Sequence, residues 1–102
     1  MAQVNFDNLR APYDVVERVK AQGRNIFVCI TPAVQAYVSQ TGDSLDNKLI
    51  ARIMGVSITT VSRYNRGEHT NPDMRHLEKL ARYLGCEPKT FFFSVKKEEE
   101  MM

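Results

Sequence analysis

The chain has 102 residues, of which 43% are apolar and 25% are charged, and its formal net charge is +2. This balance predicts one globular domain with a modest core, and the small charge excludes a histone-like or polybasic protein. The longest apolar run, IFVCI at 26–30, is far shorter than the ~20 residues of a membrane span, and the N-terminus shows no signal peptide. We therefore expect a cytoplasmic protein that contacts no membrane.

The first third of the chain predicts one helix and one short apolar segment. Residues 1–11 are expected to be irregular. Pro12 suits the first turn of a helix over 12–22, which Gly23 would end. Its buried face would consist of Val15, Val16 and Val19. The β-branched and aromatic run at 25–30 is typical of a short buried strand, although a run this short also fits a helical segment.

A second helix is predicted to begin at Thr31, with Thr31 as its cap and Pro32 in its first turn. Its inward-facing residues would be Val34, Tyr37 and Val38. The polar residues that follow, at 41–44, predict a loop.

The segment 47–66, NKLIARIMGVSITTVSRYNR, predicts two short helices that meet at a sharp turn. Asp46 can cap the first helix, and Gly55 follows its last periodic residue, where a left-handed conformation favours glycine. Ser57 can cap the second helix, expected over 58–65. The apolar positions of the first helix fall on one stripe: Leu49, Ile50, Ile53 and Met54. Ala51 is small where the second helix must cross the first.

The second of these helices has two unlike faces. Val61 and Tyr64 are three residues apart and are expected to point inward together. The outer face then presents Ile58, Thr59, Ser62 and Arg63. Such a face suits contact with base edges, because an arginine can bind guanine and an apolar side chain can meet a thymine methyl.

The C-terminal third predicts one strongly amphipathic helix. Its apolar positions, at i, i+3, i+4 and i+7, are Leu77, Leu80, Ala81 and Leu84, and Gly85 would end it. The three phenylalanines at 91–93 need burial, and they would either complete a fifth helix or form a strand. A strand at 90–95 could pair with 25–30, in the same subunit or between subunits. The tail at 94–102 is expected to be solvated.

The segment 47–66 resembles the helix-turn-helix of the lambda-repressor/Cro-like (XRE-like) family. The resemblance extends over 31–93 and includes the Arg66-Gly67 step, Asn71-Pro72-Asp73 and the stretch HLEKLARYLGCEPKTFF. Two features depart from the family pattern. Asn65 stands where the family usually has an acid, and the stretch 67–72 is one residue longer.

The resemblance implies a mainly α fold, a lambda-repressor-like bundle of four to five helices with a helix-turn-helix. To this we add the N-terminal helix and the two-stranded β element of 25–30 with 90–95. We divide the chain into an N-terminal extension at 1–30, a DNA-binding domain at 31–93 and a tail at 94–102.

The predicted DNA contacts fall into two sets. Base contacts are assigned to Ile58, Thr59, Ser62 and Arg63. Backbone contacts are assigned to Asn47, Lys48, Ser57, Thr60, Arg66, His69, Thr70 and Asn71. Three alternatives stay open: Arg63 could pair with Glu68, Ile58 could fold back onto the core, and Lys48 could be merely solvated.

These patterns predict a sequence-specific transcriptional regulator, a repressor that binds a near-palindromic operator on double-stranded DNA as a homodimer. The alternative is a protein-interaction module, such as an antitoxin that neutralises a partner and regulates its own gene. No catalytic motif, metal cluster or cofactor loop is present in the sequence, so we expect no enzyme, no metal and no cofactor. Cys29 and Cys86 have no ligand spacing and are expected to be buried thiols rather than a redox pair.

Overall fold

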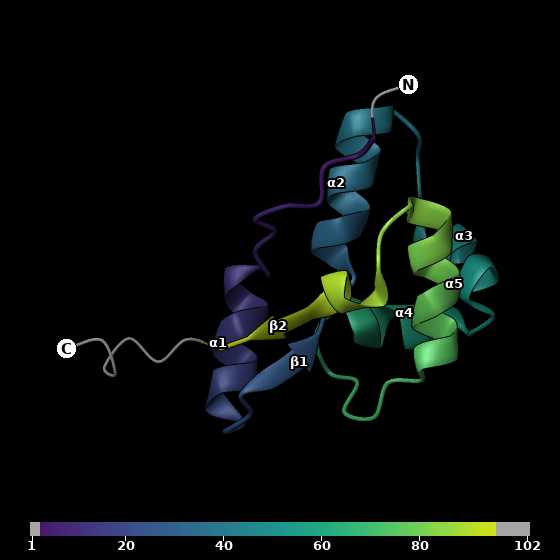
Figure 1. Ribbon diagram of the computed structural model, residues 1–102. Coiled ribbons are helices and arrows are strands. Elements are labelled where there is room, and N and C mark those ends of the chain that lie inside the picture. Colours follow the sequence, from purple (N-terminus) through teal and green to yellow (C-terminus); the bar gives the residue numbers. More distant parts are fainter. Residues whose placement is uncertain (1–2, 96–102) are drawn as a thin grey trace.

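The computed structural model of the chain describes residues 3–95, and this range contains five α-helices, one 3-10 helix and two short strands (Figure 1). In chain order the elements are α1 (Tyr13–Ala21), β1 (Ile26–Val28), α2 (Thr31–Thr41), α3 (Asn47–Met54), α4 (Ile58–Asn65), α5 (Met74–Leu84), the 3-10 helix η1 (Pro88–Phe91) and β2 (Phe92–Ser94). The mainly helical fold expected from the sequence is confirmed. Residues 96–102, most of the predicted tail, lie outside the described range.

The boundaries of α3 and α4 are set by local hydrogen bonds. Asp46 Oδ1 accepts the backbone N–H of Leu49 at 2.8 Å, and Ser57 Oγ accepts that of Thr60 at 3.1 Å. Between the two helices Gly55 adopts φ +76°, a left-handed conformation that costs other residues about 1–2 kcal/mol. Both predicted caps and the predicted end of α3 are confirmed.

The main core lies between α2, α3, α4 and α5. The stripe predicted on α5 is buried, and α3 packs against both α4 and α5. The largest fully enclosed side chains of this core are Tyr64, Phe91, Ile30, Ile50, Met54, Leu77, Leu80 and Val61. The helix-turn-helix therefore rests on a framework that also includes the end of β1 and η1.

The start of α2 differs from the prediction. Thr31 does not cap the helix: Ile30 occupies the N-cap position, and no side chain accepts a backbone N–H there. The Thr31 hydroxyl instead donates to Asn65 Oδ1, at 2.8 Å, at the end of α4. A tertiary partner therefore takes the hydroxyl that a local cap would have used.

A second, smaller core joins α1 to the sheet. It contains Val15, Val19, Phe27 and Cys29. Of the three valines predicted to be buried on α1, Val16 is only half-buried. Cys29 and Cys86 are free thiols, the first fully buried and the second half-buried, and burial raises the pKa of both.

The two strands pair antiparallel within the chain, with Phe27 opposite Phe93 and Val28 opposite Phe92. Because side chains alternate across a strand, the first pair faces α1 and the second faces the main core. The rings of Phe27 and Phe93 stack at 5.8 Å. Phe91 thus ends the 3-10 helix, and Phe92 and Phe93 belong to strand β2. The sequence left open whether this strand pairs within one subunit or between subunits, and the structure shows the pairing within one subunit.

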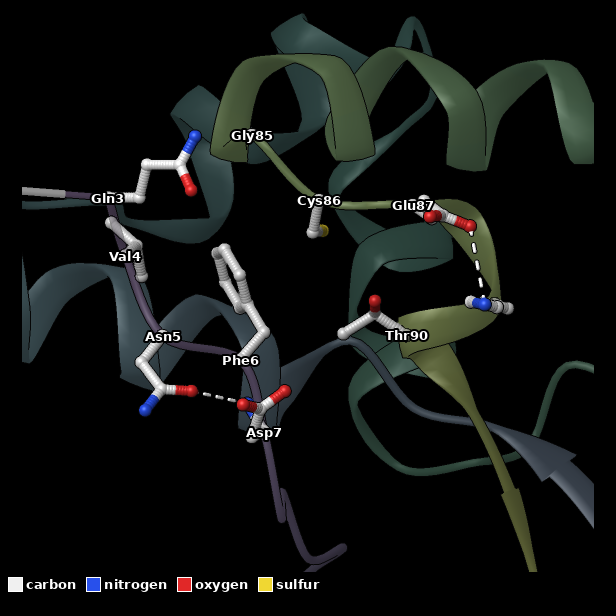
Figure 2. Close-up of a pocket in the computed structure, with 10 residues that line it drawn as sticks. Gln3, Val4, Asn5, Phe6, Asp7, Gly85, Cys86, Glu87 and Thr90 are labelled. Carbon is white, nitrogen blue, oxygen red and sulfur yellow. Dashed lines mark hydrogen bonds and ion pairs between the residues drawn. The ribbon is translucent and has the colours of Figure 1, made fainter.

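Residues 3–11 contain no helix or strand, as predicted, but they are attached to the rest of the molecule. Phe6 and Leu9 pack against the main core, and the Gln40 amide makes two 2.7 Å hydrogen bonds with the backbone of Asn5. Figure 2 shows residues 3–7 beside the turn that follows α5. The hollow between them has a volume of about 650 Å³, and Phe6 and Cys86 are among the residues that line it. None of the predicted DNA-contact residues lines this hollow.

Candidate nucleic-acid interface

The α3 and α4 helices meet through small and apolar side chains. Ala51 of α3 is buried, and Val61 and Tyr64 of α4 are fully enclosed. Residues three apart on a helix share one face, so these two anchors orient the opposite face of α4 outward. The predicted inward direction of Val61 and Tyr64 is confirmed.

The outer face of α4 presents the four residues to which base contacts were assigned. Ile58 is 47% exposed, so it does not fold back onto the core. Thr59 and Arg63 are exposed and Ser62 is half-buried. Arg63 forms no ion pair among residues 3–95. The side chains of Ile58 and Arg63 are therefore available to a partner that approaches this face of α4. Their contact with bases stays a prediction.

The N-terminal ends of α3 and α4 hold four of the predicted backbone contacts. Lys48 is exposed in the first turn of α3. The hydroxyls of Ser57 and Thr60 lie 3.0 Å apart, and both belong to the first turn or cap of α4. Asn47 Oδ1 accepts a hydrogen bond from Asn65 Nδ2 at 3.2 Å. Backbone N–H groups at helix starts suit phosphate oxygens, so the prediction remains for all four residues.

Asn65 is a structural junction that the sequence did not reveal. Its amide oxygen accepts from Thr31 of α2 and its amide nitrogen donates to Asn47 of α3. A carboxylate, which the family usually has here, can accept but cannot donate. The departure from the family pattern therefore provides a link between three helices, and only the spatial proximity of α2 and α3 could have shown it.

The turn after α4 contains a compact cluster of charges. The Arg66 guanidinium donates to both carboxylate oxygens of Glu68, at 2.9 and 3.1 Å. Arg18 of α1 lies 3.7 Å from the same carboxylate. The hydrogen bonds from Arg66 lower the pKa of Glu68. Glu68 is thus paired with Arg66 and Arg18, and the alternative pairing of Arg63 with Glu68 is wrong.

We expect Glu68→Gln to tighten DNA binding by about two- to fivefold, the range of an exposed ion pair. The substitution frees Arg66, a predicted backbone contact, and removes a negative charge beside it. Fluorescence anisotropy with a labelled duplex at low ionic strength measures the change. Glu78→Gln, at an exposed site on α5, is the matched control. Equal tightening by both variants would show that Glu68 does not restrain Arg66.

The remaining predicted backbone contacts follow in the same turn. Thr70 and Asn71 are exposed. His69 is half-buried and its ring stacks on that of Tyr64 at 4.4 Å. Burial, followed by the nearby Arg63, lowers the pKa of His69, which favours the neutral imidazole. A neutral imidazole can still donate one hydrogen bond to a phosphate, and the assignment stays a prediction.

Asp73 connects the end of this turn to α5. Its Oδ1 accepts the backbone N–H of Arg75 at 2.9 Å, and the Arg75 guanidinium donates to both carboxylate oxygens. The backbone N–H of Asp73 donates to the Tyr64 hydroxyl at 3.3 Å. The hydrogen bonds from Arg75 hold the pKa of Asp73 at about 2, below its ordinary value of 3.8.

This depressed pKa predicts a loss of stability in acid. The stabilisation from the ionised carboxylate is complete above pH 3.8 and is lost as the pH falls through about 2. The melting temperature of the native chain should therefore decline across this window. Asp73→Asn keeps an N-cap acceptor but cannot titrate. The melting temperature of this variant should therefore fall less steeply with decreasing pH in the same window. Parallel curves for the two proteins would contradict the assignment.

Metal sites and membrane spans are both absent from the part of the chain that the structure describes. No group of three or more His, Cys, Asp or Glu side chains within residues 3–95 could hold a metal ion. No helix in the same range has the length and apolar character to cross a membrane.

Comparison with known proteins agrees with the geometry of α3 and α4. Residues 44–91 match the sequence model of the family described as Helix-turn-helix, a segment that includes α3, α4, α5 and η1. No match among curated proteins reaches significance. Among solved structures, the chain is similar to a chain of the SinR protein/SinI protein complex, with 25% identity and a TM-score of 0.44, over 68% of this chain and 62% of that one. Residues 44–91 thus match a helix-turn-helix family, and this match confirms the resemblance of the segment to the lambda-repressor/Cro-like (XRE-like) helix-turn-helix.

Proposed function

We propose that the chain is a repressor that binds a near-palindromic operator as a homodimer, in a bacterial or phage cytoplasm. The observation that supports this proposal best is the accessibility of the outer face of α4. Its four candidate base-contact residues, Ile58, Thr59, Ser62 and Arg63, are accessible while the inner face of the helix is fully enclosed. We assign DNA reading to the unit at 31–93.

In the proposed complex α4 lies in the major groove. Arg63 can donate two hydrogen bonds to a guanine edge, and Ile58 can contact a thymine methyl. Thr59 and Ser62 supply hydroxyls that donate or accept. The starts of α3 and α4 and the turn after α4 would hold phosphates on either side and so set the register of the helix.

The proposed homodimer follows from charge and geometry. With a net charge of +2, one copy neutralises few phosphates, and phosphate contacts supply much of the affinity for DNA. Two copies would double these contacts and place their recognition helices on half-sites about 34 Å apart, one turn of the duplex. Repression would follow because a dimer on the operator blocks polymerase.

The test is a selection of preferred duplexes from a randomised pool, followed by a measurement of the mass of the complex. The proposal expects an enriched sequence with two related half-sites and a complex with two protein chains. An enriched single half-site with one chain would refute the homodimer. A folded sample that shows no preference among duplexes at low ionic strength would refute specific recognition.

An interaction module, such as an antitoxin, is the second candidate. It is favoured by two large apolar side chains outside the helix-turn-helix, Tyr13 at 78% and Ile26 at 65% exposed. Both belong to the N-terminal extension, which the matched family segment does not include. Light scattering and surface labelling of the purified chain discriminate the two candidates. A dimer that protects both side chains would weaken the case for a different protein partner.

A further inference from the structure

The C-terminal end of α4 is bound by side chains from the N-terminal third of the chain. Three successive backbone carbonyls accept hydrogen bonds there. The Asn65 carbonyl accepts from Cys29 Sγ at 3.3 Å, the Arg66 carbonyl from Arg18 Nη1 at 3.0 Å, and the Gly67 carbonyl from Arg24 Nη1 at 2.9 Å. The last carbonyls of a helix have no partner within it, and cations are favourable at this end. The N-terminal segment therefore supplies hydrogen-bond donors to the last residue of α4, to its C-cap residue Arg66 and to the residue beyond it.

The same segment also contacts the backbone just beyond α4. Gly67 is buried, and a Cβ atom at this position would lie 2.8 Å from Val15 of α1 and 3.3 Å from Phe27 of β1. The chain after α4 thus lies directly on the smaller core. Hydrogen bonds from the two arginines and this packing fix the end of α4 against α1 and β1.

We propose that α1 and β1 position the recognition helix for DNA, and that Arg18 and Arg24 are the positioning residues. This inference rests on the proposed reading of bases by α4. Side chains that read bases must be held within roughly 0.5 Å and 10–20° of the productive geometry. The inner face of α4 is anchored by Val61 and Tyr64, and the arginines restrain its C-terminal end, next to Arg63 and Arg66.

Arg18 acts on this end in a second way. Its guanidinium approaches Glu68, the same carboxylate that holds Arg66. When Arg66 leaves Glu68 for a phosphate, Arg18 remains as a cation beside the carboxylate. The arrangement of the turn would then persist in the DNA complex, with the phosphate-binding arginine free.

The test compares Arg18→Ala/Arg24→Ala with Lys20→Ala/Arg10→Ala. Each double variant removes two positive charges from the N-terminal segment. Among residues 3–95 the side chains of Lys20 and Arg10 form no hydrogen bond or ion pair with α4 or the turn after it: Lys20 pairs with Glu17, and Arg10 is exposed. For the arginine pair we expect a loss of about 2- to 30-fold in affinity for the selected operator, the usual range for a residue that acts through another. The loss on random duplex should match that of the control.

Two further measurements separate the positioning role from a loss of charge. Arg18→Lys/Arg24→Lys retains donors and should recover part of the operator affinity. Without DNA, the arginine-to-alanine variant, but not the control, should shift the amide resonances of 65–69. If the double variant does not fold, the single variants, each of which keeps one of the two bonds, are compared in the same way.

The outcomes separate this inference from the function on which it rests. Native protein that selects no operator refutes both. Native protein that selects an operator, with equal losses for the arginine variant and its control, refutes the positioning role alone. A variant that melts at a lower temperature but binds the operator as the native chain does would show that the two arginines only stabilise the fold.

Discussion

Gly67→Ala should lower the free energy of unfolding by about 2–4 kcal/mol, combining a left-handed backbone penalty with overpacking. Gly67 has φ +68°, and its added Cβ would lie 2.8 Å from Val15 Cγ1, nearer than real Cβ contacts occur. The neighbouring Phe27 ring, at 3.3 Å, is stacked on Phe93 and has little room to move. Urea unfolding followed by circular dichroism measures the change.

Gly42→Ala is the matched control for this effect. Gly42 also has a left-handed backbone, with φ +81°, but no atom lies within 4 Å of the position that the added methyl group would occupy. Its substitution should therefore cost only the backbone penalty, about 1–2 kcal/mol. The difference between the two variants isolates the packing of the turn against α1 and β1. If both variants lost the same free energy of unfolding, the packing of Gly67 against α1 and β1 would contribute nothing to stability.

Arg63→Ala should weaken binding to the selected operator by about 1–3 kcal/mol, the value of one base-reading arginine. Arg63 is exposed on α4 and forms no ion pair among residues 3–95, so its removal should leave the melting temperature nearly unchanged. The measurement is a titration of operator and of mutated operators by anisotropy. Relaxed specificity at one base-pair position is expected, because the lost contact distinguishes that base from the others.

Two controls give this experiment its meaning. Arg82→Ala removes the same charge from an exposed site on α5, outside the predicted interface, and should have a much smaller effect. Arg63→Lys keeps the charge but loses the planar fork that binds guanine with two hydrogen bonds, so a base contact predicts a loss there and a phosphate contact predicts little. Equal losses for Arg63→Ala and Arg82→Ala on the operator would refute a specific role for Arg63.

Local chemistry made the helix-turn-helix predictable. Asp46 and Ser57 cap the helices that follow them, and Gly55 ends α3, as their positions in the sequence indicate. The inward direction of Val61 and Tyr64 followed from helical spacing alone. Each of these features depends on residues within a few positions of one another, so a single sequence contains the information that determines it.

The geometry around the site depended on contacts between distant segments. The pairing of β1 with β2 joins residues more than sixty positions apart, and residues 90–95 by themselves fitted either a helix or a strand. Thr31 had the chemistry of a cap, but Asn65 is its partner. Glu68 was within reach of several arginines along the sequence, and the fold paired it with Arg66 and Arg18.

The sequence by itself determined the helices of the motif and the outward face of α4, because capping, glycine conformation and helical periodicity act over one or two turns. Only the tertiary structure decided what holds the far end of that helix. The contacts of Arg18, Arg24 and Gly67 with their partners join segments 40 to 52 positions apart. Such contacts depend on how α1 and β1 pack, and no local pattern encodes that packing.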